Sequence, residues 1–305
     1  MRRRLFIGSS AAWVLQGQDW RHSPAFQHLY NLDFEQAIPL LEADCVKEPA
    51  EPDHFNNLAY AILYHALFEA DALDGGLALS VAEFLNRPKA PMRKTERDRF
   101  DAALLKAEIA ARARGERADA LYALGVSQTH RANLALLVDK DWRAALKTGG
   151  EARKYHARAL VLDKTFVDAM LVPSFHEYIV GSLPIYLKAF GSLVGFTGDK
   201  HKGIEGLRTV AKYGQRARLE AQVLLALVEH REERPTLAIG LMQNLEREFP
   251  SNHLYRREVV SLLVGMKRKE EASKEFAELT QARYRYLTPV RLAAYRREFE
   301  AKLKA

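Results

Sequence analysis

Hydrophobic positions recur every three or four residues along most of the chain, and the pattern is clearest over Pro235–Leu279. It predicts a helix that stops at Pro250, a second helix, a basic turn and a third helix. Ala238 and Ala272 take the same small-residue place in the first and third of these helices, and their numbers differ by 34 (272 − 238). Phe276 follows Ala272 by one helical turn. The segment therefore predicts a repeated unit of paired helices.

The same arrangement of small residues and helix stops occurs earlier in the chain. Pro49 follows Ala37 at the offset that separates Pro250 from Ala238, and a third copy has Lys164 where a proline would stand. The spacing resembles the period of tetratricopeptide repeats, about 34 residues, in which a small residue lets paired helices approach closely. We therefore predict an all-α fold, a tetratricopeptide-like α-solenoid of stacked antiparallel helix pairs. The predicted repeat-packing residues are Ala37, Ala152, Ala159, Ala238, Pro250, Ala272 and Phe276.

The chain divides into three predicted parts. Residues 1–20 begin with Arg2, Arg3 and Arg4 followed by a short apolar run, and Arg3-Arg4-Leu5-Phe6-Ile7 is similar to the twin-arginine export pattern of bacteria. Residues 21–282 form the helical-repeat domain, and residues 283–305 form a basic C-terminal helix. The first part predicts a periplasmic or envelope-associated protein, with a cytoplasmic protein as the alternative.

A long insert separates the middle repeat from the last two. Residues 173–206 are rich in apolar and aromatic side chains, but Glu177, Pro184 and Lys188 interrupt them, which argues against a membrane span. Two interpretations stay open: a hairpin packed in the core, or an exposed patch for a lipid or small apolar ligand, a membrane or a partner protein. The candidate patch residues are Phe175, Tyr178, Tyr186, Phe190 and Phe196.

Three short motifs in and after this insert carry a family resemblance. They are Ser182-Leu183-Pro184, Gly195-Phe196-Thr197-Gly198-Asp199 and Gly203-Ile204-Glu205-Gly206-Leu207. Together they resemble the mitochondrial outer-membrane and tetratricopeptide 39 group of proteins, over about a third of the chain, from Gly181 to Leu279. The resemblance implies a helical-repeat fold and an adaptor or membrane-associated role, and it transfers no catalytic residue.

Charge and reactive side chains add few constraints. The net charge of +7 is compatible with an anionic membrane surface, while we expect no nucleic-acid partner. The single cysteine, Cys45, excludes an internal disulfide, and no two of the ten histidines stand three or four residues apart, so we expect no metal. No catalytic motif is present. We therefore expect neither a cofactor nor an enzymatic activity.

The predicted function is that of a non-catalytic scaffold that binds a protein or peptide partner in a concave groove. The alternative is a carrier that holds a lipid or a small apolar ligand in the 173–196 hairpin. Asp33 is expected to cap the second helix. The candidate groove residues are polar or aromatic and lie on helices expected to face inward: Asn56, Asn57, Tyr60, Tyr64, Arg218, Gln222, Arg256 and Arg257.

Overall fold

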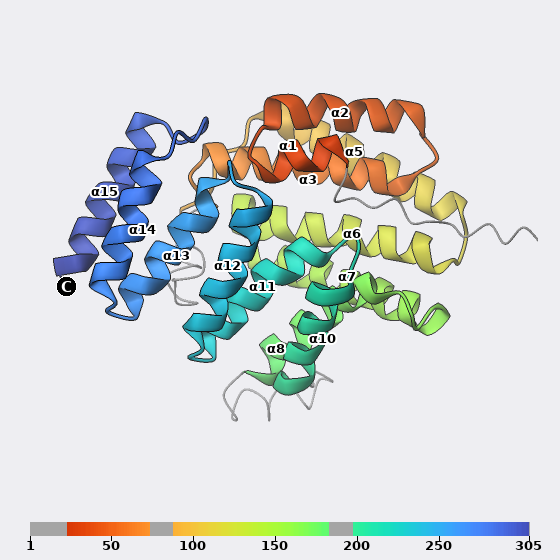
Figure 1. Cartoon of the computed structure of the whole chain (residues 1–305). Coiled ribbons are helices and arrows are strands. Elements are labelled where there is room, and N and C mark those ends of the chain that lie inside the picture. The colour runs from red at the N-terminus through yellow and green to blue at the C-terminus, as the bar shows by residue number, and fades with distance from the viewer. Residues whose placement is uncertain (1–22, 74–87, 183–197, 305) are drawn as a thin grey trace, which may run out of the picture.

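The computed structural model describes residues 23–73, 88–182 and 198–304. Every regular element in these ranges is helical, and successive helices pack side by side in antiparallel pairs, which is consistent with an α-solenoid (Figure 1). The helices are α1 (Pro24–Tyr30), α2 (Phe34–Lys47), α3 (Pro52–Glu69), α5 (Lys94–Ala113), α6 (Ala118–Leu134), α7 (Trp142–Leu162), α8 (Leu171–Gly181), α10 (Lys200–Tyr213), α11 (Arg218–Arg231), α12 (Pro235–Glu248), α13 (His253–Gly265), α14 (Lys269–Gln281) and α15 (Pro289–Lys304).

The period of the predicted repeat is visible in the backbone of the last helices. The numbers of Glu233 and Lys267 also differ by 34 (267 − 233), and both residues have a left-handed φ of 59° at the end of a helix. The next amide closes each turn in the same way: Arg234 N–H donates to the Glu229 carbonyl at 2.8 Å, and Arg268 N–H donates to Leu263 at 3.0 Å. This is the hydrogen bonding of a helix that ends in a left-handed residue. The pairs α11/α12 and α13/α14 are therefore joined by equivalent turns.

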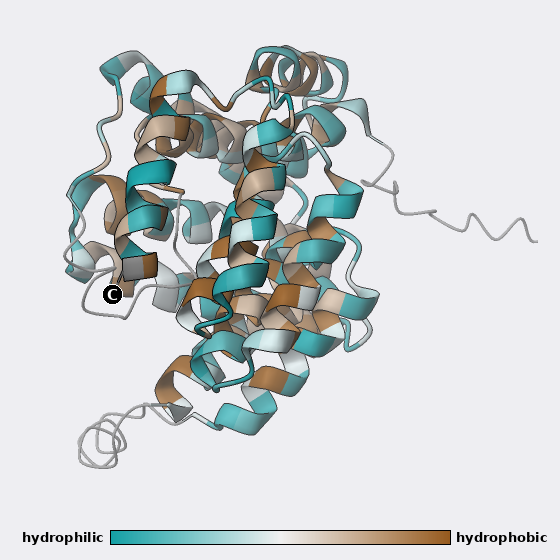
Figure 2. Ribbon diagram, turned by 60° about the vertical axis from the view of Figure 1, so that its left-hand side comes forward, coloured by the Kyte–Doolittle hydropathy of each residue, from teal (hydrophilic) through white to brown (hydrophobic). Residues whose placement is uncertain are grey.

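The small residues of the predicted repeats lie at helix crossings. Ala37, Ala238 and Ala272 are fully buried, and each follows a left-handed residue by five positions. Phe276 is also buried. Pro250 is exposed just after the end of α12, where a proline cannot continue the helix. Ala152 and Ala159 are buried where α7 packs on α6. Figure 2 shows the result, with hydrophobic residues gathered where helices face one another.

Helices α8 and α10 cross closely, because glycines occupy the contact. A β-carbon added to Gly203 would lie 2.4 Å from the Tyr178 backbone nitrogen, and one added to Gly206 would lie 2.0 Å from Ser174 Oγ. No side chain fits at these distances. Two glycines of the motifs that carried the family resemblance are therefore required for this close crossing of α8 and α10.

The N-terminal helices pack against the C-terminal repeats. We call this contact the joint and define it by Tyr30, Asp33, Phe68, Asn252, Tyr286 and Arg291. Asn252 Nδ2 donates to the Tyr30 carbonyl at 2.7 Å, and its Oδ1 caps α13 by accepting from Leu254 N–H at 3.0 Å. Asn252 is fully buried. One side chain therefore both begins α13 and holds α1 against it.

Charged contacts complete the joint. Tyr286 donates its hydroxyl to Asp33 Oδ1 at 2.6 Å, and Arg291 donates to the Phe68 carbonyl at 2.9 Å and to Asp71 at 2.7 Å. Arg285 lies 2.9 Å from Glu35. Part of the basic charge of the 283–305 segment is thus neutralised by the N-terminal helices. The regular helix in that segment, α15, begins at Pro289.

One local prediction is wrong. The Asp33 side chain makes no capping hydrogen bond to α2. Its oxygens instead accept from Tyr286 and from His28 Nδ1, which lies 3.1 Å away, so partners outside α2 replaced the predicted one. The predicted export segment, residues 1–20, lies outside the described residues, as does the middle of the 173–206 insert.

Candidate partner-binding surface

Asn56 and Tyr60, two of the predicted groove residues on α3, contact other side chains inside the protein. Asn56 is buried: its Nδ2 donates to the Ala123 carbonyl at 2.9 Å, and its Oδ1 accepts from Ser127 at 2.7 Å. Tyr60 is half-buried and stacks on Tyr64, with ring centroids 5.3 Å apart, and on His130 at 5.6 Å. Asn56 therefore fastens α3 to α6. Its side chain is enclosed between these helices and is not open to a partner.

Tyr30 of α1 lies between this aromatic stack and α11, with its ring centroid 6.4 Å from that of Tyr60. Tyr30 donates its hydroxyl to Glu220 Oε1, and burial raises the pKa of both groups. Burial, and the nearby Glu220 carboxylate, also raise the pKa of Tyr60. Asn57 lies beside these residues on α3 and is half-buried. Tyr30 of α1 thus connects Tyr60 of α3 to Glu220 of α11, and protein side chains already contact one another there.

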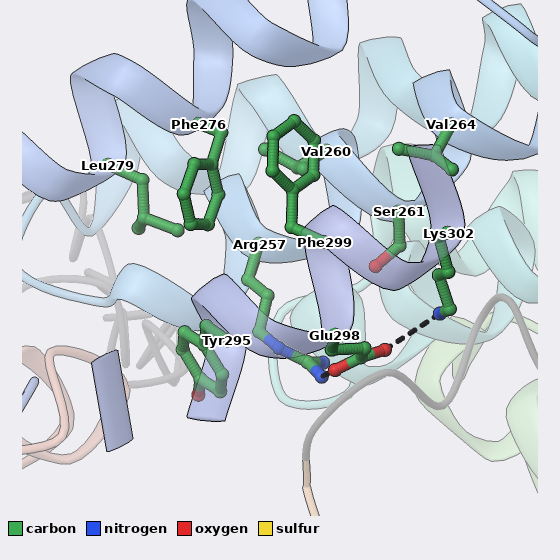
Figure 3. A pocket seen from close by; sticks show the side chains of 10 residues that line it. All are labelled: Arg257, Val260, Ser261, Val264, Phe276, Leu279, Tyr295, Glu298, Phe299 and Lys302. Atoms are coloured by element: carbon green, nitrogen blue, oxygen red, sulfur yellow. Dashed lines mark hydrogen bonds and ion pairs between the residues drawn. The ribbon is translucent and has the colours of Figure 1, made fainter. Parts of the chain in front are cut away.

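Three of the predicted arginine and glutamine candidates also have partners within the protein. Arg218 pairs with Glu248, and Gln222 Nε2 donates to the Ala211 carbonyl at 3.4 Å. Arg257 is buried, pairs with Glu298 at 2.6 Å and lies 4.5 Å over the Tyr295 ring. Arg257 lines the pocket drawn in Figure 3, between α13, α14 and α15, whose volume is only about 20 Å³. That space suits about one water molecule, so the pocket is part of the helix packing.

The described part of the candidate apolar patch belongs to the core. Tyr178 is buried in α8 and donates its hydroxyl to Glu232 at 3.2 Å. Phe175 is half-buried and packs on the same cluster as Tyr178, Ile204 and Leu207. Tyr186, Phe190 and Phe196 lie outside the described residues.

A larger opening lies among the last repeats, near the place where α12 ends and α13 begins. This cleft, of about 460 Å³, lies between α12, α13, α14 and the segment that follows α14. Its size is within the range of ligand-binding clefts. Of the predicted groove residues, Arg256 alone lines it. The lining residues are Gln243, Glu246, Arg247, Pro250, Arg256, Glu275, Ala282 and Tyr284.

Arg256 organises the charges in the cleft. Its guanidinium lies 2.6 Å from Glu246 and 2.7 Å from Glu278, whereas Glu275 is 3.9 Å away. Burial acts to lower the pKa of Arg256, but the hydrogen bond and the charge of Glu246 outweigh it, so this pKa is raised. Burial raises the pKa of Glu275, and although the Arg256 charge acts to lower it, Glu278 and Glu246 act with burial and the pKa stays raised. Three carboxylates therefore surround one guanidinium, and Glu275 is the least well paired of them.

Within ranges 23–73, 88–182 and 198–304, no group of three or more His, Cys, Asp or Glu side chains could hold a metal ion. In those ranges no helix combines the length and the apolarity that crossing a bilayer requires. Burial lowers the pKa of His156 to about 4, so this histidine is neutral and packs edge-on against Tyr122. Burial also raises the pKa of the Cys45 thiol to about 11, which makes it a poor nucleophile.

No protein-family model matches this chain, and no curated protein matches it.

Most of the cleft residues could not be predicted from the sequence, because their polar and charged side chains do not recur at the 34-residue spacing of the repeat. The repeat register places Leu241 at the position of Glu275 (275 − 34), and Ala277 and Thr280 at the positions of Gln243 and Glu246. No periodic signal therefore marks these side chains. Only the packing of α12 against α13 and α14 brings them to one opening.

Proposed function

We propose that this protein is a non-catalytic, tetratricopeptide-like scaffold, and that a segment of a partner protein binds in the cleft between α12, α13 and α14. The observation that carries the proposal is that protein side chains fill the space between α3 and α11, whereas the cleft is open. Tyr30 of α1 fills the space between Tyr60 of α3 and Glu220 of α11, while the cleft is open and is lined by both polar and apolar groups. An extended peptide needs an opening with groups that can accept and donate hydrogen bonds.

The fold supports a binding role in a second way. The turns that follow α11 and α13 repeat at the spacing of the sequence pattern and fix the helices on both sides of the cleft. A rigid surface loses little conformational entropy when it binds a flexible segment, which favours affinity. We also propose an envelope location, on the basis of Arg3, Arg4 and the apolar run that follows them. The lipid-carrier alternative is not carried forward, since Phe175 and Tyr178 pack among core residues.

The test fills the cleft with a bulky side chain. Ala282 lines the cleft and is exposed, so Ala282→Trp should occupy the opening without changing the charge. The full-length wild-type and variant chains are used for affinity capture in host cells. We expect a partner that the wild type retains to be lost with Ala282→Trp.

The matched control is Ala277→Trp, which places the same side chain at an exposed position of α14 outside the cleft lining. The control should retain the partner as the wild type does. Equal retention by Ala282→Trp and Ala277→Trp would show that the partner binds elsewhere. Circular dichroism of both variants checks that the helices are intact.

A further inference from the structure

The three carboxylates around Arg256 are not equivalent. Glu246 and Glu278 accept short hydrogen bonds from the guanidinium. Glu275 is 3.9 Å from Arg256 Nε, and among the described residues it accepts no hydrogen bond from any donor. The second arginine of the cleft, Arg247, donates to Asn244. Glu275 therefore forms only a long ion pair with Arg256, whose hydrogen bonds go to the other two carboxylates.

The surroundings of Glu275 fit a side chain with a charged end and an apolar stem. Glu275 is half-buried on α14, which limits the water available to its carboxylate. Tyr284 and Ala282 line the same cleft and offer aromatic and apolar surface. Lysine and arginine side chains bury their methylene stems on such surface while the charged end reaches an acceptor. A carboxylate that accepts a charge-assisted hydrogen bond gains more than one that accepts a neutral donor.

We propose that the partner segment carries a lysine or arginine whose charged end pairs with Glu275 and whose stem lies along Tyr284. This inference rests on the proposed function, because it assumes that the cleft binds a protein segment. Two glutamates and two arginines line the cleft, so its lining carries no net charge. The recognition therefore rests on Glu275, the carboxylate without a short hydrogen bond to Arg256, and on the Tyr284 ring beside it.

The test uses a displayed library of random linear peptides, selected on the full-length wild-type chain. Selected peptides are then titrated as free peptides against the wild type and three variants. Ala282→Trp fills the cleft, Glu275→Gln removes one charge with little change in shape, and Glu270→Gln removes an exposed carboxylate of α14 that lies outside the cleft lining. Circular dichroism confirms that each variant is folded.

We expect the peptides that Ala282→Trp fails to bind to share a lysine or arginine. Glu275→Gln should raise their Kd by about tenfold or more, as expected for a charge-assisted hydrogen bond. Glu270→Gln should change the Kd less than about twofold, since its charge is solvated. The Kd should also rise with added salt.

Two other outcomes separate the two proposals. Peptides that depend on an open cleft but lack a basic residue, or that bind Glu275→Gln as they bind the wild type, would overturn the role of Glu275 and leave the cleft as the binding surface. Selection of no peptide that Ala282→Trp rejects would overturn both.

Discussion

Asp33 in the joint and Glu275 in the cleft are both half-buried carboxylates beside arginines, yet their surroundings differ. Asp33 accepts from Tyr286 at 2.6 Å and from His28 at 3.1 Å, with Arg285 at 3.4 Å. Burial acts to raise the Asp33 pKa, but these hydrogen bonds and charges outweigh it and the pKa is lowered. Burial raises the pKa of Glu275, and with two neighbouring carboxylates it outweighs the opposing charge of Arg256.

The difference separates carboxylates that hold the fold together from those that are open to a partner. A carboxylate with several donors stabilises the folded state, because its ionised form is favoured there. A carboxylate whose folded pKa is raised does the opposite at neutral pH. The joint therefore has its acceptors satisfied within the chain, and the cleft has one acceptor in excess. Four predictions test this comparison, from the largest expected effect to the smallest.

The largest effect should come from Asn252→Ala in the joint. This change removes the cap of α13 and leaves the buried Tyr30 carbonyl without its donor. Together these losses should lower the free energy of unfolding by about 3 kcal/mol. Urea denaturation measures it. Ser251→Ala is the control, since Ser251 contacts Asn31 through its backbone nitrogen and the side chain is exposed. If both variants were equally stable, Asn252 would not hold the joint.

The second prediction concerns pH. Burial lowers the pKa of His253 to about 3, and Arg291 and Arg257 contribute. The unfolded histidine has a pKa near 6.5. Between those values the unfolded chain binds a proton that the folded chain does not, so stability is lost as the pH falls below about 6.5. The loss from pH 7 to pH 5 should be about 2 kcal/mol.

The readout for His253 is the pH slope of the unfolding free energy. His253→Leu should remove about 2 kcal/mol of the fall between pH 7 and pH 5, whatever its stability at pH 7. An unchanged pH slope in this variant would mean that His253 becomes protonated in the folded protein.

Asp33→Asn should have the third-largest effect. The variant loses the charge that attracts Arg285 and weakens the acceptor for Tyr286, so the free energy of unfolding should fall by about 2 kcal/mol at pH 7. Since the folded pKa is lowered, this stabilisation exists above the unfolded pKa of about 3.9 and is lost as the pH falls through the folded pKa. Glu35→Gln, at an exposed partner of Arg285, should cost less than about 0.5 kcal/mol. Equal effects would show that burial of Asp33 contributes nothing.

The smallest effect should come from Glu275→Gln. Because the folded pKa of Glu275 is raised, its ionisation opposes folding above the unfolded pKa, and this cost disappears at acid pH. The variant should therefore be as stable as the wild type or more stable by about 0.5 kcal/mol at pH 7. Thermal unfolding at pH 7 and pH 4 measures the difference. A marked destabilisation would place Glu275 with Asp33 among the residues that hold the fold.

The repeat and the sites differ in how far the sequence could predict them. Ala238, Ala272 and Phe276 were identified because helix packing demands a small residue at a fixed spacing, and this demand repeats along the chain. Asp33 was assigned a local cap because its partner Tyr286 lies 253 residues away (286 − 33) and no local pattern records that distance. The cleft could not be predicted for the same reason, since Glu246, Arg256 and Glu275 meet through tertiary packing alone.

The central claim is that a partner binds the cleft between α12, α13 and α14 and not the groove positions predicted on α3 and α11. The most direct measurement places the photo-crosslinking residue p-benzoylphenylalanine at Arg247, exposed in the cleft, or at Gln222, half-buried among the predicted inner positions. Irradiation in host cells should yield a discrete protein adduct from position 247 and none from position 222. An adduct from position 222 alone would contradict the account and return the partner to the interior.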